Sequence, residues 1–264
     1  MSHNKSTLVL LHGWGFNSAI WQMNLEYLQT HYNNYNILPL DLNGHGEEKY
    51  NQLFCATNYY LEYLISKIPV SKNINILGWS LGGIIALQLK AKFPEVFNKV
   101  FLCASTPCFI NNDNSPFWIH GVNIETWDKF SEDLLNNYTK TLNNFMLLQT
   151  MNAENNSSKK LYKQLVTINN HSTPASIDGL KWGLNILKQD YRELLNIIDN
   201  NKLYFILGRQ DRLVNQSLQT WLAENHPNIK TYLLLNSGHM PFITEPEEFY
   251  FCLEKNLQYE PRLL

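Results

Sequence analysis

The first half of the chain alternates short apolar runs with segments of helical spacing. Runs of four or five mainly apolar residues, the length of a buried strand, each end in a polar or glycine-containing turn. They predict strands at Thr7–Leu11, Asn36–Leu40, Ile74–Leu77 and Val100–Ala104. Helices are expected between them at Ser18–Thr30, with Ser18 as the N-terminal cap, at Thr57–Ile68, which Pro69 ends, and at Ile84–Lys92.

The pattern changes after Cys108. Apolar residues then recur every three or four positions, as on one face of a helix, and little strand signal remains as far as about Leu195. One long helix is expected along Trp127, Phe130, Leu134, Tyr138, Leu142, Phe145 and Gln149. Two further groups repeat the spacing, namely Leu161, Leu165 and Ile168, and Ile177, Leu180, Leu184 and Leu187. Strands return at Lys202–Leu207 and Ile229–Leu235, with helices at Gln216–Asn225 and from about Pro246.

These periods predict an α/β fold in which a mostly parallel sheet carries helices on both faces. Residues 1–110 and 196–264 would form the core, and residues 111–195 a helical cap inserted into it. Because right-handed crossovers join successive parallel strands, the carboxyl ends of the strands meet at one edge of the sheet. His12, Asp41 and Ser80 each follow such an end.

The composition narrows the class of protein. The 264 residues, 44% of them hydrophobic, suit one α/β domain with an insertion or, alternatively, two domains. A formal net charge of −2 gives no reason to expect nucleic acid or an anionic membrane as a partner. No apolar run reaches the length of a membrane span, and the polar start lacks a signal-peptide core, so we expect a cytoplasmic protein. The four cysteines lack metal-ligand spacing, and we expect free thiols with neither metal nor cofactor.

The strongest candidate for chemistry is Ser80, which lies in the G-x-S-x-G run Gly78–Gly82. An apolar strand precedes this run and a helix follows it. In that setting a serine sits on a sharp turn with the helix N-terminus directed at it. The pattern alone is weak because it also occurs by chance, but its place between strand and helix predicts a nucleophile.

A serine hydroxyl needs a base, and the base needs an acid that fixes its tautomer. For a serine on such a turn, the expected chain order is serine, acid, histidine. Asp211 and His239 follow this order, on the loops after two successive late strands. Asp190 and Asp199 are rival acids, although neither follows an obvious strand. His12 is interpreted as a structural residue of its own loop.

The tetrahedral intermediate also needs donors for its oxyanion. The backbone N–H of Leu81, the residue after the serine, would supply one. The N–H of Trp14, in the loop after the first strand, would supply the other, and the Trp14 indole could then line the acyl pocket.

Together these segments resemble the α/β-hydrolase superfamily and, more narrowly, the pimeloyl-[acyl-carrier protein] methyl ester esterases of biotin synthesis. The likeness covers nearly the whole chain, and the runs that carry it are Leu10–Gly15, Leu77–Gly83, Ala104–Phe109, Leu148–Met151, Gly183–Leu187 and Gly238–Ile243. The resemblance implies the α/β-hydrolase fold with its cap. It also implies that the substrate ester is surrounded by Trp14, Ser80, Leu81, His239 and the cap residues Phe145, Met146, Leu147, Leu148 and Gln149.

The resemblance further implies a reaction. It is hydrolysis of the methyl ester of pimeloyl-[acyl-carrier protein] to pimeloyl-[acyl-carrier protein] and methanol, through an acyl-enzyme on Ser80. The acyl carrier protein would be the partner, and we expect a monomer. Two alternatives of the same fold stay open, a general short-chain carboxylesterase and the menaquinone-pathway synthase that eliminates pyruvate. The synthase binds a polycarboxylate, which needs arginines in the pocket. The cap of this chain has almost no arginine.

Two features depart from the family. Its members usually have an extra strand before the oxyanion loop, whereas here only residues 1–6 precede the first strand, so the sheet either lacks that edge or forms it differently. The family's cap also carries arginines that face the acidic carrier. The comparable stretch here has Lys140, Lys159, Lys160 and Lys163, which can meet an acidic helix as point charges or form a solvated basic face.

Overall fold

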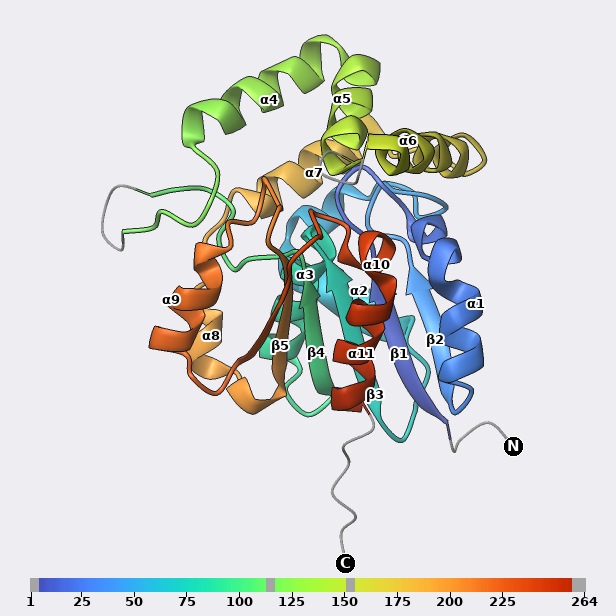
Figure 1. Cartoon of the computed structure of the whole chain (residues 1–264), viewed down its shortest axis with the longest axis vertical. Coiled ribbons are helices and arrows are strands. Elements are labelled where there is room, and N and C mark those ends of the chain that lie inside the picture. The colour runs from blue at the N-terminus through green and yellow to red at the C-terminus, as the bar shows by residue number, and fades with distance from the viewer. Residues whose placement is uncertain (1–4, 113–116, 151–154, 258–264) are drawn as a thin grey trace, which may run out of the picture.

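The architecture is a parallel sheet between two layers of helices, seen in a computed structural model that describes residues 5–112, 117–150 and 155–257 (Figure 1). Within these residues six strands form one sheet in the order β2-β1-β3-β4-β5-β6, and every neighbouring pair is parallel. The strands are β1 Ser6–Leu11, β2 Tyr35–Leu40, β3 Ile74–Trp79, β4 Phe97–Cys103, β5 Leu203–Gly208 and β6 Lys230–Leu234.

The helices follow the strands in alternation, apart from one insertion. Those of the core are α1 Gln22–His31, α2 Thr57–Ser66, α3 Leu81–Lys92, α8 Leu194–Ile197, α9 Ser217–Asn225, α10 Pro241–Thr244 and α11 Pro246–Leu257. The insertion, which precedes α8 and β5, carries α4 Ile124–Asn136, α5 Tyr138–Thr150, α6 Asn155–Asn170 and α7 Ile177–Leu187. Short 3₁₀ turns η1 Ser18–Trp21, η2 Gln52–Cys55 and η3 Asn200–Lys202 complete the chain order.

The two faces of the sheet build two apolar layers. Side chains alternate along a strand, so Leu8 and Leu10 of β1 face one side while Val9 and Leu11 face the other. The first side packs with residues of α1 and α11, and the second with residues of α2 and α3. The inner strands are almost wholly buried because helices cover both faces.

Among the described residues the sheet ends at β2. The extra N-terminal strand that is usual in the family is therefore missing from this edge of the described sheet. Pro39 lies in β2, paired in register with Leu10 of β1. A proline lacks the N–H that an inner strand would need, and an edge strand tolerates this loss. Residues 1–4 lie outside the described part.

Two expected helix features are wrong. Asn17, not Ser18, caps the first helical turn, because its side chain accepts from the N–H of Ala19 at 3.0 Å while the Ser18 N–H donates to Asp41 at 2.6 Å. The long helix expected from Trp127 to Gln149 is two helices, α4 and α5. Asn137 breaks it by leaving helical geometry (φ −152°, ψ 72°), and its side chain then accepts from the N–H of Lys140 at 3.3 Å.

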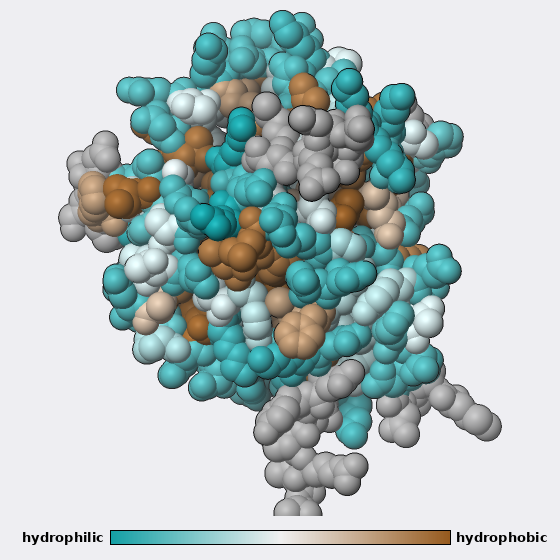
Figure 2. Space-filling model, in the orientation of Figure 1, coloured by the Kyte–Doolittle hydropathy of each residue, from teal (hydrophilic) through white to brown (hydrophobic). Residues whose placement is uncertain are grey.

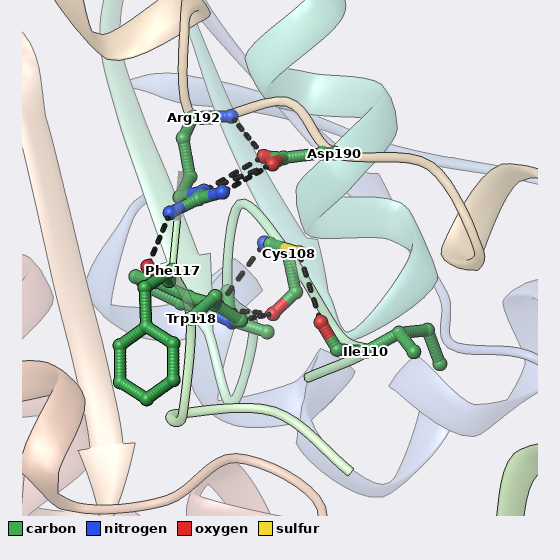
Figure 3. A network of polar contacts seen from close by, with 7 residues as sticks. Cys108, Ile110, Phe117, Trp118, Asp190 and Arg192 are labelled. Carbon is green, nitrogen blue, oxygen red and sulfur yellow. Dashed lines mark hydrogen bonds and ion pairs between the residues drawn. The ribbon is translucent and has the colours of Figure 1, made fainter. Parts of the chain in front are cut away.

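The segment between β4 and β5 lies above the carboxyl ends of the strands (Figure 1). Its two connections to the core are tied together (Figure 3). Cys108 and Asp190 form an antiparallel bridge, and Asp190 pairs with Arg192 at 2.6 Å. Arg192 also donates to the Phe117 carbonyl at 3.1 Å, and the Trp118 indole donates to the Cys108 carbonyl at 2.9 Å. The base of the insertion is therefore held by several polar contacts.

Helix α7 is docked directly on the core. The Trp182 indole donates to the Phe54 carbonyl at 3.1 Å, and the Ser176 N–H donates to the Gly44 carbonyl at 2.7 Å. Gly44 and Gly179 touch so closely that a Cβ on Gly44 would lie 2.4 Å from the Gly179 Cα. This contact joins the loop after β2 to the first turn of α7.

The surface gives little sign of a large apolar interface. The face in Figure 2 is mainly hydrophilic, with separate apolar patches, and the exposed large apolar side chains belong to many different elements. In the described part of the chain, no helix combines the length and apolarity that crossing a membrane requires. All four cysteines are free thiols, as expected.

Candidate active site

Ser80 lies at the junction of β3 and α3 in a strained conformation. Its φ of 53° and ψ of −113° are unusual for a residue with a side chain, and it is buried. Two contacts hold it there, since its N–H donates to the Cys103 carbonyl at 2.9 Å and the Ser105 hydroxyl donates to the Ser80 carbonyl at 2.8 Å. A Cβ on Gly82 would lie 2.4 Å from the Leu11 carbonyl oxygen, so only glycine lets α3 start this close to β1.

Asp211 and His239 meet at the same edge of the sheet. His239 Nδ1 and Asp211 Oδ2 are 2.7 Å apart, with 4% and 1% of the two side chains exposed. The other carboxylate oxygen accepts from the N–H groups of Leu213, at 2.8 Å, and Val214, at 3.1 Å. His239 Nε2 is buried and has no hydrogen-bond partner among the described residues. The imidazole is thus fixed through one nitrogen and open at the other.

The rival acids lie elsewhere. Asp190 pairs with Arg192, and Asp199 accepts from the N–H of Asn201 at 3.1 Å. Neither forms a hydrogen bond or ion pair with His239. No cluster of three or more His, Cys, Asp or Glu side chains able to hold a metal occurs in the part of the chain that the structure describes.

His12 is a structural residue, which confirms its interpretation from the sequence. Its Nε2 accepts from the N–H of Leu42 at 2.9 Å, so Nδ1 carries the proton and donates to the Gly13 carbonyl at 2.8 Å. Burial is the main cause that lowers the pKa of His12, and the imidazole stays neutral. With both nitrogens engaged, His12 holds the loop after β1 to the loop after β2.

Trp14 joins that loop to the insertion. Its indole donates to the Leu180 carbonyl of α7 at 2.9 Å, so this N–H is used inside the protein. The ring meets Phe145 edge-on with centroids 4.9 Å apart and Phe130 at 5.3 Å. The backbone N–H of Leu81, the first residue of α3, has no acceptor within the helix. Neither this N–H nor that of Trp14 has an acceptor among the described residues.

Only part of the segment from Phe145 to Gln149 faces the Asp211–His239 pair. Leu148 and Gln149 line a cavity of about 10 Å³ together with His239. Gln149 is 2% exposed, and neither atom of its amide has a partner among the described residues. Met146 instead packs in the apolar core, and Leu147 is 49% exposed. Met151, which the resemblance included, lies outside the described residues.

Of the four lysines proposed for carrier docking, two line a common groove. Lys160 and Lys163 of α6 line a groove of about 440 Å³, across from Met23 of α1. Lys159 and Lys140 are also exposed, but they do not line this groove.

Three residues that support the site were not found from the sequence. The Trp79 indole donates to the His239 carbonyl at 2.7 Å. Glu245 accepts from the N–H of Asn236 at 2.9 Å and from the Ser237 hydroxyl at 2.7 Å, which fixes the turn before His239. Ser105 is the third. Trp79 and Ser105 lie in two of the runs that carry the family resemblance, Leu77–Gly83 and Ala104–Phe109, whereas nothing in the sequence indicated Glu245.

The family profile described as "alpha/beta hydrolase fold" matches residues 6–246. The chain belongs to the α/β-hydrolase fold family. The pimeloyl-[acyl-carrier protein] methyl ester esterase of Nitrosomonas europaea is 31% identical to this hydrolase over 253 residues, or 95% of each chain. The protein of the same name from Xylella fastidiosa (strain 9a5c) is 32% identical over 251 residues, covering 94% of this hydrolase and 93% of the relative.

Solved structures agree on the fold. An esterase from Exiguobacterium antarcticum superimposes with a TM-score of 0.76 at 19% identity, covering 97% of this hydrolase and 93% of that chain. The predicted fold family and enzyme class, a serine hydrolase of carboxylic esters, are confirmed by these comparisons.

Proposed function

We propose that this hydrolase cleaves the methyl ester of pimeloyl-[acyl-carrier protein], giving pimeloyl-[acyl-carrier protein] and methanol for biotin synthesis. The observation that carries the chemistry is the buried hydrogen bond between Asp211 and His239, which leaves His239 Nε2 without a partner among the described residues. Ser80 lies in a strained turn at the same edge of the sheet, and we take it as the group that Nε2 serves. The names of the relatives support the choice of ester.

Acylation follows from this arrangement. Ser80 Oγ attacks the ester carbonyl carbon and passes its proton to His239 Nε2, while Asp211 holds Nδ1–H and stabilises the imidazolium. The N–H groups of Leu81 and Trp14 bind the oxyanion. When the intermediate collapses, the C–O bond to the methoxy group breaks and His239 returns the proton, so methanol leaves first.

Deacylation repeats the proton transfers with water. His239 takes a proton from a water molecule as its oxygen attacks the acyl carbon on Ser80. The bond to Ser80 Oγ then breaks, the serine regains its proton, and the free carboxylate of the pimeloyl chain is released.

We propose that residues 111–195 form a cap that shapes the acyl pocket. The Trp14 and Phe145 rings give an apolar wall for a medium-length chain. The Gln149 amide is buried beside His239 without a protein partner among the described residues, and a buried amide is stabilised by any polar group that reaches it. We assign it to the polar end of the bound ester.

The carrier protein would dock against the groove that Lys160 and Lys163 line. Two cations flanking an apolar floor fit an acidic, amphipathic helix. Cytoplasmic location and a monomeric state stay predictions.

Ser80→Ala is the direct test of this function. Without the hydroxyl no acyl-enzyme forms, so the variant should fold normally, lose cleavage of pimeloyl-[acyl-carrier protein] methyl ester and fail to restore growth of a biotin-requiring strain that lacks its esterase. Wild type should restore growth, and a fluorophosphonate should label it on Ser80.

Ser217→Ala is the matched control, because Ser217 is a serine hydrogen-bonded to a histidine, His120, at 2.7 Å but lies outside this site. It should keep activity and labelling. Growth supported by Ser80→Ala would exclude Ser80 as the nucleophile. Labelling of wild type without growth would leave the serine hydrolase intact and point to another ester.

A further inference from the structure

Trp79 is the residue before the nucleophile, and its side chain reaches the loop that carries the base. The side chain is buried, with 1% exposed, and its indole Nε1 donates to the His239 backbone carbonyl at 2.7 Å. No other donor to this carbonyl is found among the described residues. The two rings lie with centroids 5.9 Å apart.

The same ring also supports the loop proposed to bind the oxyanion. A Cβ on Gly13 would lie 2.9 Å from Cε3 of Trp79, so the backbone of Gly13 rests on the indole. Gly13 immediately precedes Trp14, whose N–H is one of the two proposed oxyanion donors. Phe16 of that loop and Phe242 after the histidine loop pack on the ring at 5.0 Å and 5.2 Å between centroids.

His239 has two other tethers, and neither starts from the nucleophile. Asp211 fixes the imidazole from the loop after β5, and Glu245 fixes the preceding turn from the α10–α11 connection. Trp79 is joined to Ser80 by one peptide bond. Its hydrogen bond therefore sets the His239 backbone relative to the nucleophile through a single residue.

We propose that Trp79 is a positioning residue that holds the His239 loop and the Gly13–Trp14 loop in register with Ser80. The proposal rests on the Ser80, Asp211 and His239 roles given above. Loss of the indole N–H releases the His239 carbonyl and lets the base drift from the serine. Misplacement of a catalytic group by about 1 Å costs roughly 100-fold in rate. Removing the indole should therefore lower kcat more than removing an equally buried tryptophan elsewhere would.

The test compares Trp79→Phe with Trp118→Phe. Trp118 is a fair match because it is also 1% exposed and donates to a backbone carbonyl, that of Cys108, at 2.9 Å. With a short p-nitrophenyl ester, Trp79→Phe should lower kcat by about 10- to 100-fold while KM changes little. Trp118→Phe should lose comparable thermal stability but keep kcat. Equal kcat values in the two variants would overturn the proposal.

A second variant separates the hydrogen bond from the packing of the ring. Replacing Trp79 by its benzothiophene analogue keeps the ring volume and removes only the N–H. This variant should lose kcat as Trp79→Phe does and also slow fluorophosphonate labelling of Ser80. If the protein with the analogue kept the wild-type kcat, the proposed role of the indole N–H would be wrong. This test remains available even if Trp79→Phe does not fold.

Because the Trp79 variants are assayed with a p-nitrophenyl ester, their result does not depend on whether the carrier-bound methyl ester is the natural substrate. A p-nitrophenyl ester reports on the catalytic groups alone. If wild type cleaves it in a Ser80-dependent way but ignores the carrier-bound ester, the substrate proposal fails and the test of Trp79 still stands.

Discussion

Three buried histidines show how the surroundings of a residue decide its role. His12 uses both ring nitrogens inside the protein, and His239 uses one and leaves the other open. His45 donates through Nδ1 to the Asn43 carbonyl at 3.0 Å, and burial lowers its pKa to about 3, assisted by His12 with a ring centroid 5.2 Å away. His45 Nε2 is likewise buried without a partner among the described residues, so what distinguishes His239 is its pairing with Asp211 and the bond from Trp79, the residue before Ser80, to its carbonyl.

His45 should make the fold sensitive to mild acid. Its pKa of 6.5 in the unfolded chain falls to about 3 on folding, so its contribution to stability is complete above pH 6.5 and is lost as the pH falls below it. Between pH 7 and pH 5 the free energy of unfolding should drop by about 2 kcal/mol on this account. Urea unfolding at the two pH values should show a smaller drop for His45→Asn than for wild type. Equal drops would exclude His45 as the cause.

At the scale of elements, the contact between the loop after β2 and α7 fixes the insertion on the core. Gly44 has a φ of +73° and accepts from the N–H of Ser176 at 2.7 Å. Asp41 shapes the loop by accepting from the N–H groups of Ser18 and Glu47, at 2.6 and 2.9 Å. The sequence suggested only a turn at this place.

Gly179→Ala should therefore destabilise the protein although alanine favours helices. The new Cβ would lie 2.5 Å from the Gly44 carbonyl oxygen, and such overpacking costs about 1–3 kcal/mol, against a helix gain of about 1 kcal/mol. Thermal unfolding should show a lower midpoint, and ester cleavage should fall because α7 also carries the Trp14 contact. Asn185→Ala, at an exposed position of the same helix, should change neither quantity. A wild-type midpoint for Gly179→Ala would contradict the close packing.

Features that depend on local sequence or on the order of the strands could be predicted from the sequence. Apolar runs marked the strands, and strand order placed Ser80, Asp211 and His239 at one edge of the sheet. The break at Asn137 was missed because the apolar spacing continues across it. The Trp79–His239 bond joins residues 160 positions apart, and no local period indicates which carbonyl an indole will meet. Such contacts depend on how the loops pack in three dimensions.

At the scale of the whole molecule, local charge matters more than the net charge of −2. Lys160 and Lys163 gather at the groove between α1 and α6, on the side of the insertion. Lysines attract an acidic partner at a distance but lack the paired donors of arginine, so docking should be fast, weak and sensitive to salt.

Reversing both charges should separate docking from chemistry. Lys160→Glu combined with Lys163→Glu should raise KM for the carrier-bound ester about 10-fold or more, since like charges now face the acidic carrier. Cleavage of a free methyl ester should stay unchanged. Lys230→Glu, at the opposite ends of the strands, is the control and should affect neither substrate. A raised KM for both esters, or for neither, would remove these lysines from the docking surface.

The bridge between Cys108 and Asp190 brings the two ends of the inserted segment side by side. A segment whose ends meet at its base can be lengthened, shortened or exchanged without pulling on the strands below it. Natural variation can therefore remodel the proposed acyl pocket while the loops that carry Ser80, Asp211 and His239 stay constant. A chimaera that joins a foreign insertion at these two positions offers a practical route to esterases with new chain-length preferences.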